Sequence, residues 1–363
     1  MVRAVVLIVV GACGFSPTLA PGDGRNGEAA IGSEPMPMHS FRKRIAINAN
    51  SPTELVDFPV SIVLTTDADL VAHARADGSD IGFATSDGTP LSYEIVAYAS
   101  GSLEAWVRIP SVTATAEIFL VYGGDTATSN PKPVWTGYAA AWHFAEGANS
   151  WTDSAAGHVV APISVTTTAT STLGGIVGAA RNFDGVDDAT PAPTPDDNSL
   201  DFGTTSFSVS TWVNVTSSAD AFDEPIDKSG DTNLPGYCFT LGTSNWLVEI
   251  SDGPNVKTAR FAGEAESLGH WVYLAAVIDR STPALIAYTN GALAQSVSLT
   301  GVGSLDTDLP LAIGTTISQY RFKGIVDEVR IVKQALTLDW IAAEYRNAMM
   351  RATFVMVDFE QML

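Results

Sequence analysis

The sequence predicts an all-β protein made of two antiparallel β-sandwich domains. Two observations support this fold class. Strand-length runs in which apolar and polar residues alternate recur along the chain, for example "FPVSIVL" (58–64), and turn segments such as "ADGSD" separate them. Charged residues make up only 16% of the chain, and Thr, Val, Gly and Asp are abundant, which favours short strands and turns over long helices.

The first group of strands spans residues 39–124, where we expect a small β-sandwich. Its strand-length runs are "RIAINA", "FPVSIVL", "IGFAT", "LSYEIVAY", "EAWVRIP" and "AEIFLVYG". Regular spacing of short strands is typical of sandwiches. A proline-bearing segment at 125–137 is predicted to be a linker.

The second group spans residues 138–363 and is predicted to form a larger jellyroll with one short helix near its end. Thr289–Gly291 is predicted to be a hairpin turn, because Asn-Gly favours a tight reversal. Thr337 is the expected cap of the helix, whose apolar stripe would be Leu338, Ile341, Ala342 and Tyr345. The strand "TFVMVDFE" closes this region.

The first residues read as a targeting segment. Arg3 supplies a positive charge, Ala4–Val10 is apolar, and "VVGAC" ends at Cys13. That ending resembles a bacterial lipobox, which implies a signal peptide at 1–13 and lipidation of Cys13. An ordinary signal cleaved after Ala20 is the alternative. Residues 14–38 are predicted to be a flexible tether, and the resemblance implies a lipid-anchored protein of the cell envelope, on the outer membrane or cell surface.

The charge balance limits the partners. The formal net charge of −21 argues against nucleic acid and against unassisted binding to anionic lipid, so membrane attachment is expected only through the lipid anchor. If Cys13 is lipidated, Cys238 has no intrachain partner, and its strand-like surroundings predict a small buried side chain.

Two stretches resemble known families. "ADGSDIGFATSDGTPLSYEIVAY", "EAWVRIP" and "EIFLVYGG" resemble the bacterial domain-of-unknown-function family 2341. "AARNFDGVDDA", "FSVSTWVN", "AYTNGAL" and "FKGIVDEVRIVKQALTLDWIAAEYRNA" are similar to the laminin-G-like, or concanavalin A-like, jellyroll. The resemblance implies fold more than activity, because this jellyroll hosts lectins, hydrolases and adhesion modules.

The motifs favour binding over catalysis. The chain has no Glu-x-Asp-x-Glu triplet of the related glucanases and no G-x-S-x-G. We therefore expect a non-enzymatic cell-surface recognition protein for a glycan or a cell-surface protein. The alternatives are a glycan-cleaving hydrolase and a purely structural envelope protein. Trp151, Trp246 and Tyr320 are candidate ligand platforms, but core or edge packing is the favoured interpretation for each, because large aromatic side chains are usually mostly buried.

The strand "GIVDEVRI" carries an acid on an apolar face. Strict alternation places Asp327 beside Ile325, Val329 and Ile331, facing a core, and leaves Glu328 and Arg330 as a solvated pair outside. A buried carboxylate must be satisfied. Three solutions are open: a latch to backbone N–H groups of a neighbouring turn (the favoured one), pairing with a cation such as Arg181, or a shared Ca²⁺. That Ca²⁺, the one candidate cofactor, would be held with Asp184, Asp187 and Asp188.

Overall fold

The computed structural model describes most of the chain from Met38 onward. The described residues are 38–146, 150–160, 170–172, 174–186, 190–191, 196–216, 223–230, 233–242, 245–261, 268–315 and 321–363. Residues 36–363 form one compact unit. Cys13, Asp187, Asp188 and Tyr320 lie outside the described residues, so the hypotheses about them stay predictions.

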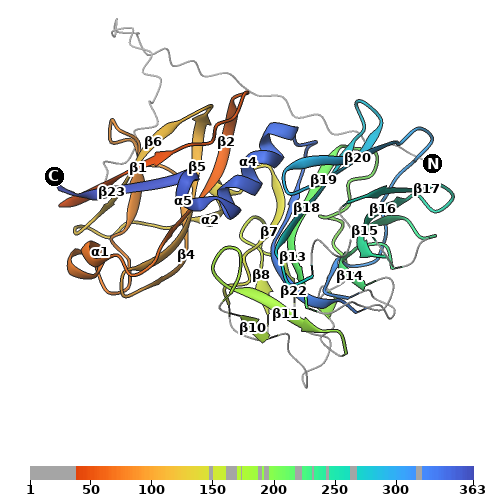
Figure 1. Ribbon diagram of the computed structural model, residues 1–363, viewed down its shortest axis with the longest axis horizontal. Helices are drawn as coiled ribbons and strands as arrows, with labels where there is room; N and C mark the ends of the chain where they lie inside the picture. Colours follow the sequence, from red (N-terminus) through yellow and green to blue (C-terminus); the bar gives the residue numbers. More distant parts are fainter. Residues whose placement is uncertain are drawn as a thin grey trace, which may run out of the picture. The chain divides into compact units, whose positions relative to one another are not determined.

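The first sandwich consists of a four-stranded and a three-stranded sheet (Figure 1). The strand orders are β23-β1-β6-β3 and β2-β5-β4. Their bounds are β1 Phe41–Ile47, β2 Leu55–Leu64, β3 Gly82–Ala84, β4 Tyr93–Ala99, β5 Ser102–Val112, β6 Ala116–Tyr122 and β23 Val355–Met362, with helix α1 at Ala68–His73. Alternate residues of the two sheets, among them Ile45, Phe58 and Leu120, fill a common core.

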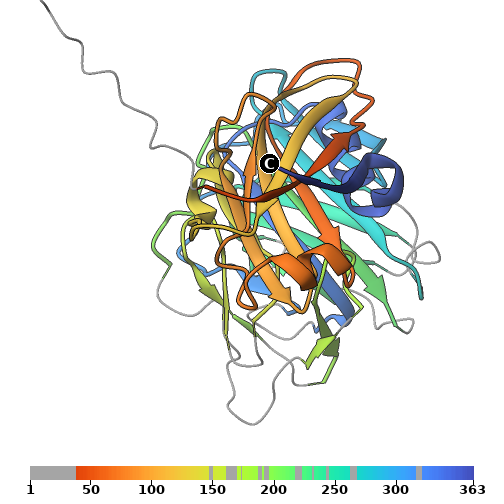
Figure 2. The ribbon, with the colours of Figure 1, turned by 90° about the vertical axis from the view of Figure 1, so that its left-hand side faces the viewer.

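The last strand joins the first sandwich. β23 pairs antiparallel with β1, with Phe41 opposite Met362 and Ile47 opposite Val355. Figure 2 shows this dark blue strand beside the red strand β1. The prediction that this strand belongs to the second region is therefore wrong, because alternation predicts a strand but not its neighbour.

The second sandwich contains an eight-stranded and a six-stranded sheet, ordered β10-β11-β22-β13-β18-β19-β20, with β7 also paired to β22, and β12-β21-β14-β15-β16-β17. β8 and β9 form a separate pair. The bounds are β7 Tyr138–Trp142, β8 Trp151–Thr152, β9 Val159–Val160, β10 Thr170–Thr172, β11 Ala180–Asp184, β12 Thr190–Pro191, β13 Phe207–Val215, β14 Asp223–Asp227, β15 Gly236–Leu241, β16 Trp246–Ser251, β17 Val256–Arg260, β18 Val272–Asp279, β19 Ala284–Thr289, β20 Ala292–Ser298, β21 Ala312–Ile313 and β22 Lys323–Val332.

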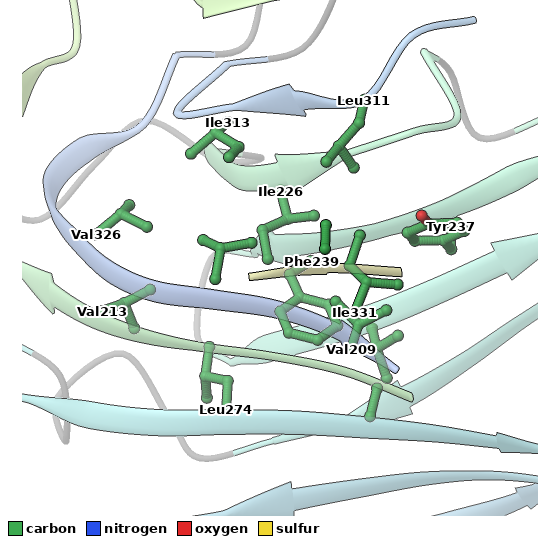
Figure 3. Close-up of a cluster of buried hydrophobic side chains, with 14 of the residues drawn as sticks. Val209, Val213, Ile226, Tyr237, Phe239, Leu274, Leu311, Ile313, Val326 and Ile331 are labelled. Atoms are coloured by element: carbon green, nitrogen blue, oxygen red, sulfur yellow. The ribbon is translucent and has the colours of Figure 1, made fainter. Parts of the chain in front are cut away.

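The core of the second sandwich takes side chains from both sheets. Figure 3 shows Val209, Val326 and Ile331 of the larger sheet meeting Ile226 and Phe239 of the smaller one. Cys238 is a free, buried thiol in β15, as predicted. The all-β fold class is confirmed, and so is the hairpin, since Thr289 pairs with Ala292 and both Asn290 and Gly291 have positive φ.

One helix packs between the two sandwiches. Helix α4, Leu338–Met349, begins as predicted at Thr337, whose Oγ1 accepts a hydrogen bond from Trp340 N at 3.3 Å. Its expected stripe is only partly right, because Leu338 is 47% exposed. The helix buries two faces: Ala343 lies in the core of the first sandwich, and Ile341 and Ala348 lie in an apolar cluster shared by both sandwiches. A single-stripe pattern cannot predict burial on two sides.

The expected linker is packed rather than exposed. It contains the short helix α2, Pro131–Val134, and buries Val134 and Trp135 in the shared cluster. The remaining short helix is α5, Arg351–Phe354. Among the described residues, none of the helices is long and apolar enough to cross a membrane.

Candidate functional site

Strand β22 departs from strict alternation at its two acids. Glu328 has a positive φ of 49°, and the pairing with β13 shifts register between Ser210 and Trp212. Such a bulge places one extra residue in β22 and reverses which face the following residues occupy. Val326, Val329 and Ile331 therefore all lie in the core of the second sandwich. The predicted faces are therefore right for Val329 and Ile331 but wrong for Val326 and Asp327, which precede the bulge.

Asp327 lies on the other face of the sheet. It is directly opposite Trp212, which belongs to the cluster shared by the sandwiches, and paired residues project to the same side. The prediction that Asp327 shares a face with Val329 and Ile331 is therefore wrong. The side chain is nevertheless fully buried, because the first sandwich and the loop before β11 cover this face.

The carboxylate of Asp327 is held by backbone N–H groups. Val177 N donates to Oδ2 at 3.0 Å and Glu328 N donates to Oδ1 at 2.8 Å. This is the latch that the sequence analysis favours. Burial raises the pKa of Asp327 well above its usual range, and the neighbouring Glu328 carboxylate raises it further.

The two alternative partners of Asp327 are directed elsewhere. Arg181 lies opposite Val326, and its guanidinium stacks 4.7 Å above the Trp151 ring, on the core side of the sheet. Asp184 is exposed and pairs opposite Lys323, roughly 13 Å along the strand from Asp327 at about 3.3 Å per residue. The proposed calcium set with Asp327 and Asp184 is therefore wrong for these two members.

Glu328 and Arg330 are buried, which contradicts the solvated pair expected from sequence. They are 2% and 5% exposed, and Arg330 donates to Glu328 Oε2 at 2.7 Å. The imidazole Nδ1 of His143, just after β7, lies 2.9 Å from Glu328 Oε1. The guanidinium of Arg330 also stacks over the Trp106 ring at 4.3 Å. These contacts join the second sandwich to β5 of the first.

The ion pairs continue into helix α4. Arg330 also donates to Glu344 Oε1 at 3.3 Å, and the Glu344 carboxylate accepts hydrogen bonds from Tyr273 at 2.5 Å and from Tyr138 at 3.3 Å. Glu344 is 3% exposed, so the hydroxyls of the two tyrosines and the guanidinium of Arg330 replace the water molecules that its carboxylate loses on burial.

A second arm reaches β4 of the first sandwich. Trp135 Nε1 donates to Glu94 Oε2 at 2.6 Å, and Ser154 Oγ donates to Glu94 Oε1 at 2.5 Å. His143 Nε2 lies 3.6 Å from the same carboxylate. Sequence reasoning missed Trp135, because a tryptophan in a proline-bearing segment gives no periodic signal.

We call Glu94, Glu104, His143, Glu328, Arg330 and Glu344 the charged cluster. Burial alone would lower the pKa of His143, but the carboxylates of Glu328 and Glu94 raise it to about 10, so the ring is a cation at neutral pH. Burial, followed by repulsion from Glu328, raises the pKa of Glu104 to about 7. The cluster holds the two sandwiches in one arrangement, in the way that supporting side chains fix a binding site.

A groove opens beside this cluster, where the sandwiches meet. We call it the Trp340 groove; its volume is about 460 Å³. Its walls are Glu54, Leu55, Val56, Asp57 and Arg108 of the first sandwich, Thr136, Gly137 and Tyr138 after the linker, and Val332, Gln334, Ala335, Leu336, Thr337 and Trp340 at the end of β22 and the start of α4. Tyr138 connects the groove to the charged cluster through Glu344.

The polar groups of the Trp340 groove are fixed in place. Asp57 has a positive φ of 61° and pairs with Arg108 at 2.5 Å. Arg108 also donates to the carbonyl of Pro133 at 3.2 Å. One buried donor of the groove residues, Arg108 Nε, has no hydrogen-bond partner among the described residues, whereas the Trp340 indole is hydrogen-bonded to Tyr138. A strained backbone and unsatisfied buried donors both occur frequently at binding sites.

Two of the candidate aromatic platforms are core residues instead, which is the interpretation that the sequence favours for them. Trp151 and Trp246 are both fully buried in the core of the second sandwich, where Trp151 packs edge-on against Phe144. Trp340, the aromatic residue of the groove, lies within the predicted helix, and the sequence gives no separate signal for it.

A family comparison agrees with the second sandwich. The family model for the concanavalin A-like lectin/glucanases superfamily, of the laminin G type, matches residues 184–342. This range is less than half of the chain. No curated protein matches the chain. The resemblance of residues 39–124 to family 2341 stays a prediction.

Solved structures with a similar fold include three toxin binding domains. The binding domain of Paraclostridial Mosquitocidal Protein 1 aligns with a TM-score of 0.49 at 14% identity, covering 58% of this chain and 52% of that one. The botulinum neurotoxin serotype G binding domain has a TM-score of 0.46 at 12% identity, covering 57% and 50%. The serotype D ligand binding domain in complex with N-acetylneuraminic acid has a TM-score of 0.46 at 14% identity, covering 58% and 50%. The chain thus spans about half of their length, and at these identities the likeness concerns the fold alone.

Proposed function

We propose that the protein is a non-enzymatic recognition module whose Trp340 groove binds a saccharide unit of a glycan. The observation that carries the proposal is the buried, unpartnered donor Arg108 Nε, which belongs to a groove that also contains the acids Glu54 and Asp57 and the Trp340 ring. A buried donor without a partner costs free energy, which a ligand oxygen relieves.

The remaining groups of the groove suit a sugar as well. Glu54, Asp57 and the Gln334 amide offer acceptors for hydroxyl groups, and the half-buried Trp340 ring offers apolar surface for the C–H face of a pyranose. A volume of about 460 Å³ is within the usual range of small-ligand sites. Recognition of a polyhydroxylated ligand needs this mixture of donors, acceptors and aromatic surface.

The acids of the groove support binding rather than cleavage. Asp57 is held in an ion pair with Arg108, and Glu54 accepts a hydrogen bond from Ser111. Both carboxylates are thus engaged by donors of the protein itself, rather than arranged as the free acid pair that glycoside hydrolysis uses.

A glycan array probed with the full chain tests the proposal. We expect binding to a restricted set of glycans and at least about tenfold weaker binding by Asp57→Asn, because Asn tolerates a positive φ but loses the charge. The matched control is Asp87→Asn, an exposed aspartate in another turn of the first sandwich. Equal affinity of Asp57→Asn and the parent would place the glycan site elsewhere. Release of reducing ends from a bound glycan would favour the hydrolase instead.

The proposed location is the cell envelope, with a lipid on Cys13. This rests on the order Arg3, apolar run and "VVGAC". We also keep the division into a sandwich at 39–124, a linker at 125–137 and a jellyroll from 138 as a proposal, with the last strand, β23, assigned to the first sandwich. Mass spectrometry of the mature protein should find residues 1–12 removed and Cys13 acylated. An unmodified N-terminus at Pro21 would contradict the anchor.

A further inference from the structure

A lysine of the second sandwich is fully buried between two carboxyl groups. Lys228 lies in the turn after β14, and its Nζ is 2.8 Å from Asp201 Oδ1 and 3.2 Å from Asp196 Oδ1. The side chains of Asp201 and Asp196 are only 6% and 9% exposed. We call these three residues the lysine–aspartate site; they belong neither to the Trp340 groove nor to the charged cluster.

Hydrogen bonds hold the lysine at both of its ends. Lys228 N donates to the Tyr237 carbonyl at 2.9 Å, and Lys228 Nζ donates to the Leu309 carbonyl at 3.0 Å. The nitrogen therefore has little freedom to move away from the two acids. Reacting groups that are held in contact behave as if they were at a very high local concentration.

The two acids share a proton. The carboxyl groups of Asp201 and Asp196 are hydrogen-bonded to each other, and two carboxyl groups can do this only when one of them carries a proton. Burial raises the pKa of Asp201, and although the Lys228 ammonium lowers it, the neighbouring Asp196 adds to the increase, so that the net shift is upward. Asp201 is therefore the acid that carries the proton. A protonated carboxyl group is the form that an amine can attack with loss of water.

The surroundings of the lysine–aspartate site are dry and aromatic. Tyr237 is 3% exposed; burial raises the pKa of its hydroxyl well above the usual range, and the nearby Asp201 and Asp196 raise it further. Phe202, directly after Asp201, stacks on Phe207 with the ring centroids 4.3 Å apart. Burial of an ammonium and a carboxylate costs free energy, and a neutral amide would remove both charges from this environment.

We propose that Lys228 and Asp201 form an intramolecular isopeptide bond, with Asp196 as the group that accepts and returns protons. The Lys228 ammonium first gives a proton to the Asp196 carboxylate, and the lone pair of Nζ then attacks Cγ of the protonated Asp201 carboxyl group. The bond between Nζ and Cγ forms, and the bond between Cγ and the hydroxyl oxygen breaks.

The protons and charges of this reaction balance without any further reactant. Nζ gives up two protons in all, of which one leaves with the Asp201 hydroxyl as water and the other stays on Asp196. The products are a neutral amide, one water molecule and a protonated Asp196. Because the site is buried, bulk water has little access to the amide, which protects the bond from hydrolysis.

The bond would connect the two sheets of the second sandwich. Lys228 directly follows β14 of the six-stranded sheet, and Asp201 lies shortly before β13 of the eight-stranded sheet. A covalent link between distant positions restricts the unfolded chain, in the way that a disulfide does. The proposed bond thus goes beyond the proposed glycan binding and concerns how the jellyroll is held together.

A second lysine of the chain serves as an internal control. Lys43 also lies between two aspartates, with Nζ 2.5 Å from Asp67 and 2.8 Å from Asp69. Asp69 is 38% exposed, so water reaches this pair, and Asp67 is the cap of helix α1, where it accepts hydrogen bonds from two backbone N–H groups. We therefore expect no amide at Lys43, although its distances to the acids are as short as those of Lys228.

Peptide mapping of the full chain by mass spectrometry tests the proposal. Chymotrypsin cleaves after aromatic residues, and Phe202 and Phe222 lie between Asp201 and Lys228 in the sequence. The peptide that contains Lys228 should nevertheless stay joined to the peptide that contains Asp201, with a combined mass lower by one water. Fragmentation should locate the link at Asp201, and Lys43 should be recovered unlinked.

Two variants test the roles of the residues. Lys228→Arg keeps the positive charge but lacks the amine, so its two peptides should separate. Asp196→Asn keeps both reacting groups and removes the proton acceptor, so after cell-free synthesis its linked fraction should rise at least about tenfold more slowly than that of the parent. The peptide map of the parent decides the main point even where a variant does not fold.

Three outcomes would overturn the proposal. Recovery of Lys228 only in unlinked peptides from the folded parent chain would show that the site is an ion pair and nothing more. A link to Asp196 in place of Asp201 would refute the roles assigned to the two acids. Equal rates for Asp196→Asn and the parent would refute the proton transfer to Asp196. None of these measurements depends on glycan binding at the Trp340 groove.

Discussion

Replacing Glu328 by glutamine removes one charge from the centre of the charged cluster. The carboxylate pairs with His143 at 2.9 Å and with Arg330 at 2.7 Å, and its side chain is 2% exposed. Glutamine keeps the volume and one acceptor, so the change mainly leaves the imidazolium and the guanidinium less compensated. Arg330 retains Glu344 at 3.3 Å, whereas His143 retains only the more distant Glu94 at 3.6 Å.

The expected loss is about 3 kcal/mol in the free energy of unfolding, at the lower end of the roughly 3–5 kcal/mol for breaking a buried ion pair. The matched control is Glu117→Gln. Glu117 pairs with Arg44 at 2.5 Å, but both side chains are 39% exposed, and such surface pairs contribute about 0–1 kcal/mol. Both variants replace an ion-paired glutamate by glutamine, and they differ in how deeply that ion pair is buried.

Urea unfolding followed by tryptophan fluorescence measures both variants. The guanidinium of Arg330 stacks 4.3 Å from the Trp106 ring and 5.1 Å from the Trp135 ring, so the emission reports on the cluster directly. A loss for Glu328→Gln below 1 kcal/mol, or equal to that of Glu117→Gln, would show that the cluster is screened like a surface pair and would refute the reasoning.

Four further changes test other parts of the structure. Folding raises the pKa of Glu104 from 4.5 to about 7, so the free energy of unfolding falls as the pH rises through this range. The free energy of unfolding of Glu104→Gln should therefore exceed that of the parent by about 1–3 kcal/mol at pH 8 and equal it at pH 4, as measured by urea unfolding at both pH values. Asp327→Ala should cost about 2–6 kcal/mol, since it leaves two buried N–H groups unpaired, with the same melting temperature in calcium and in chelator. Gly178→Ala should cost about 1–3 kcal/mol more than Gly301→Ala in thermal unfolding, because both have positive φ but only the Gly178 Cβ would overlap the Glu104 carboxylate. Lys228→Met should cost about 3–5 kcal/mol by leaving Asp196 and Asp201 without their cation, and a melting temperature equal to that of the parent would contradict this.

Much of the fold follows from local patterns in the sequence. Alternation predicts most of the long strands, Asn290-Gly291 predicts its hairpin, and Thr337 predicts the start of α4, because each depends on neighbouring residues alone. Local patterns do not predict which residues of β22 lie on which face of the sheet. One residue with positive φ, Glu328, reverses the alternation, and a glutamate gives no signal for that conformation.

The candidate site depends on contacts that local patterns do not contain. Arg330 and Glu328 look like a solvated pair because a strand pattern cannot show that the first sandwich covers that face of the sheet. Trp135 and Trp340 become site residues only once the sandwiches meet, and Trp151 and Trp246 leave the site because their rings turn into the core. For all four tryptophans, contacts between segments distant in the sequence determine whether the side chain belongs to the site.

The pairing of β1 with β23 has a consequence for how the chain is made. Arg42 and Gln361, whose side chains are hydrogen-bonded across the two strands, are 319 positions apart. At about 5–20 residues per second, a ribosome needs roughly 15–60 s to reach the partner of β1. Throughout that time the first sheet has an open edge at β1, where a foreign strand can pair. The first sandwich is therefore the last part of this chain to be completed, although its residues emerge first, and a nascent chain stalled within the second sandwich carries that edge unprotected.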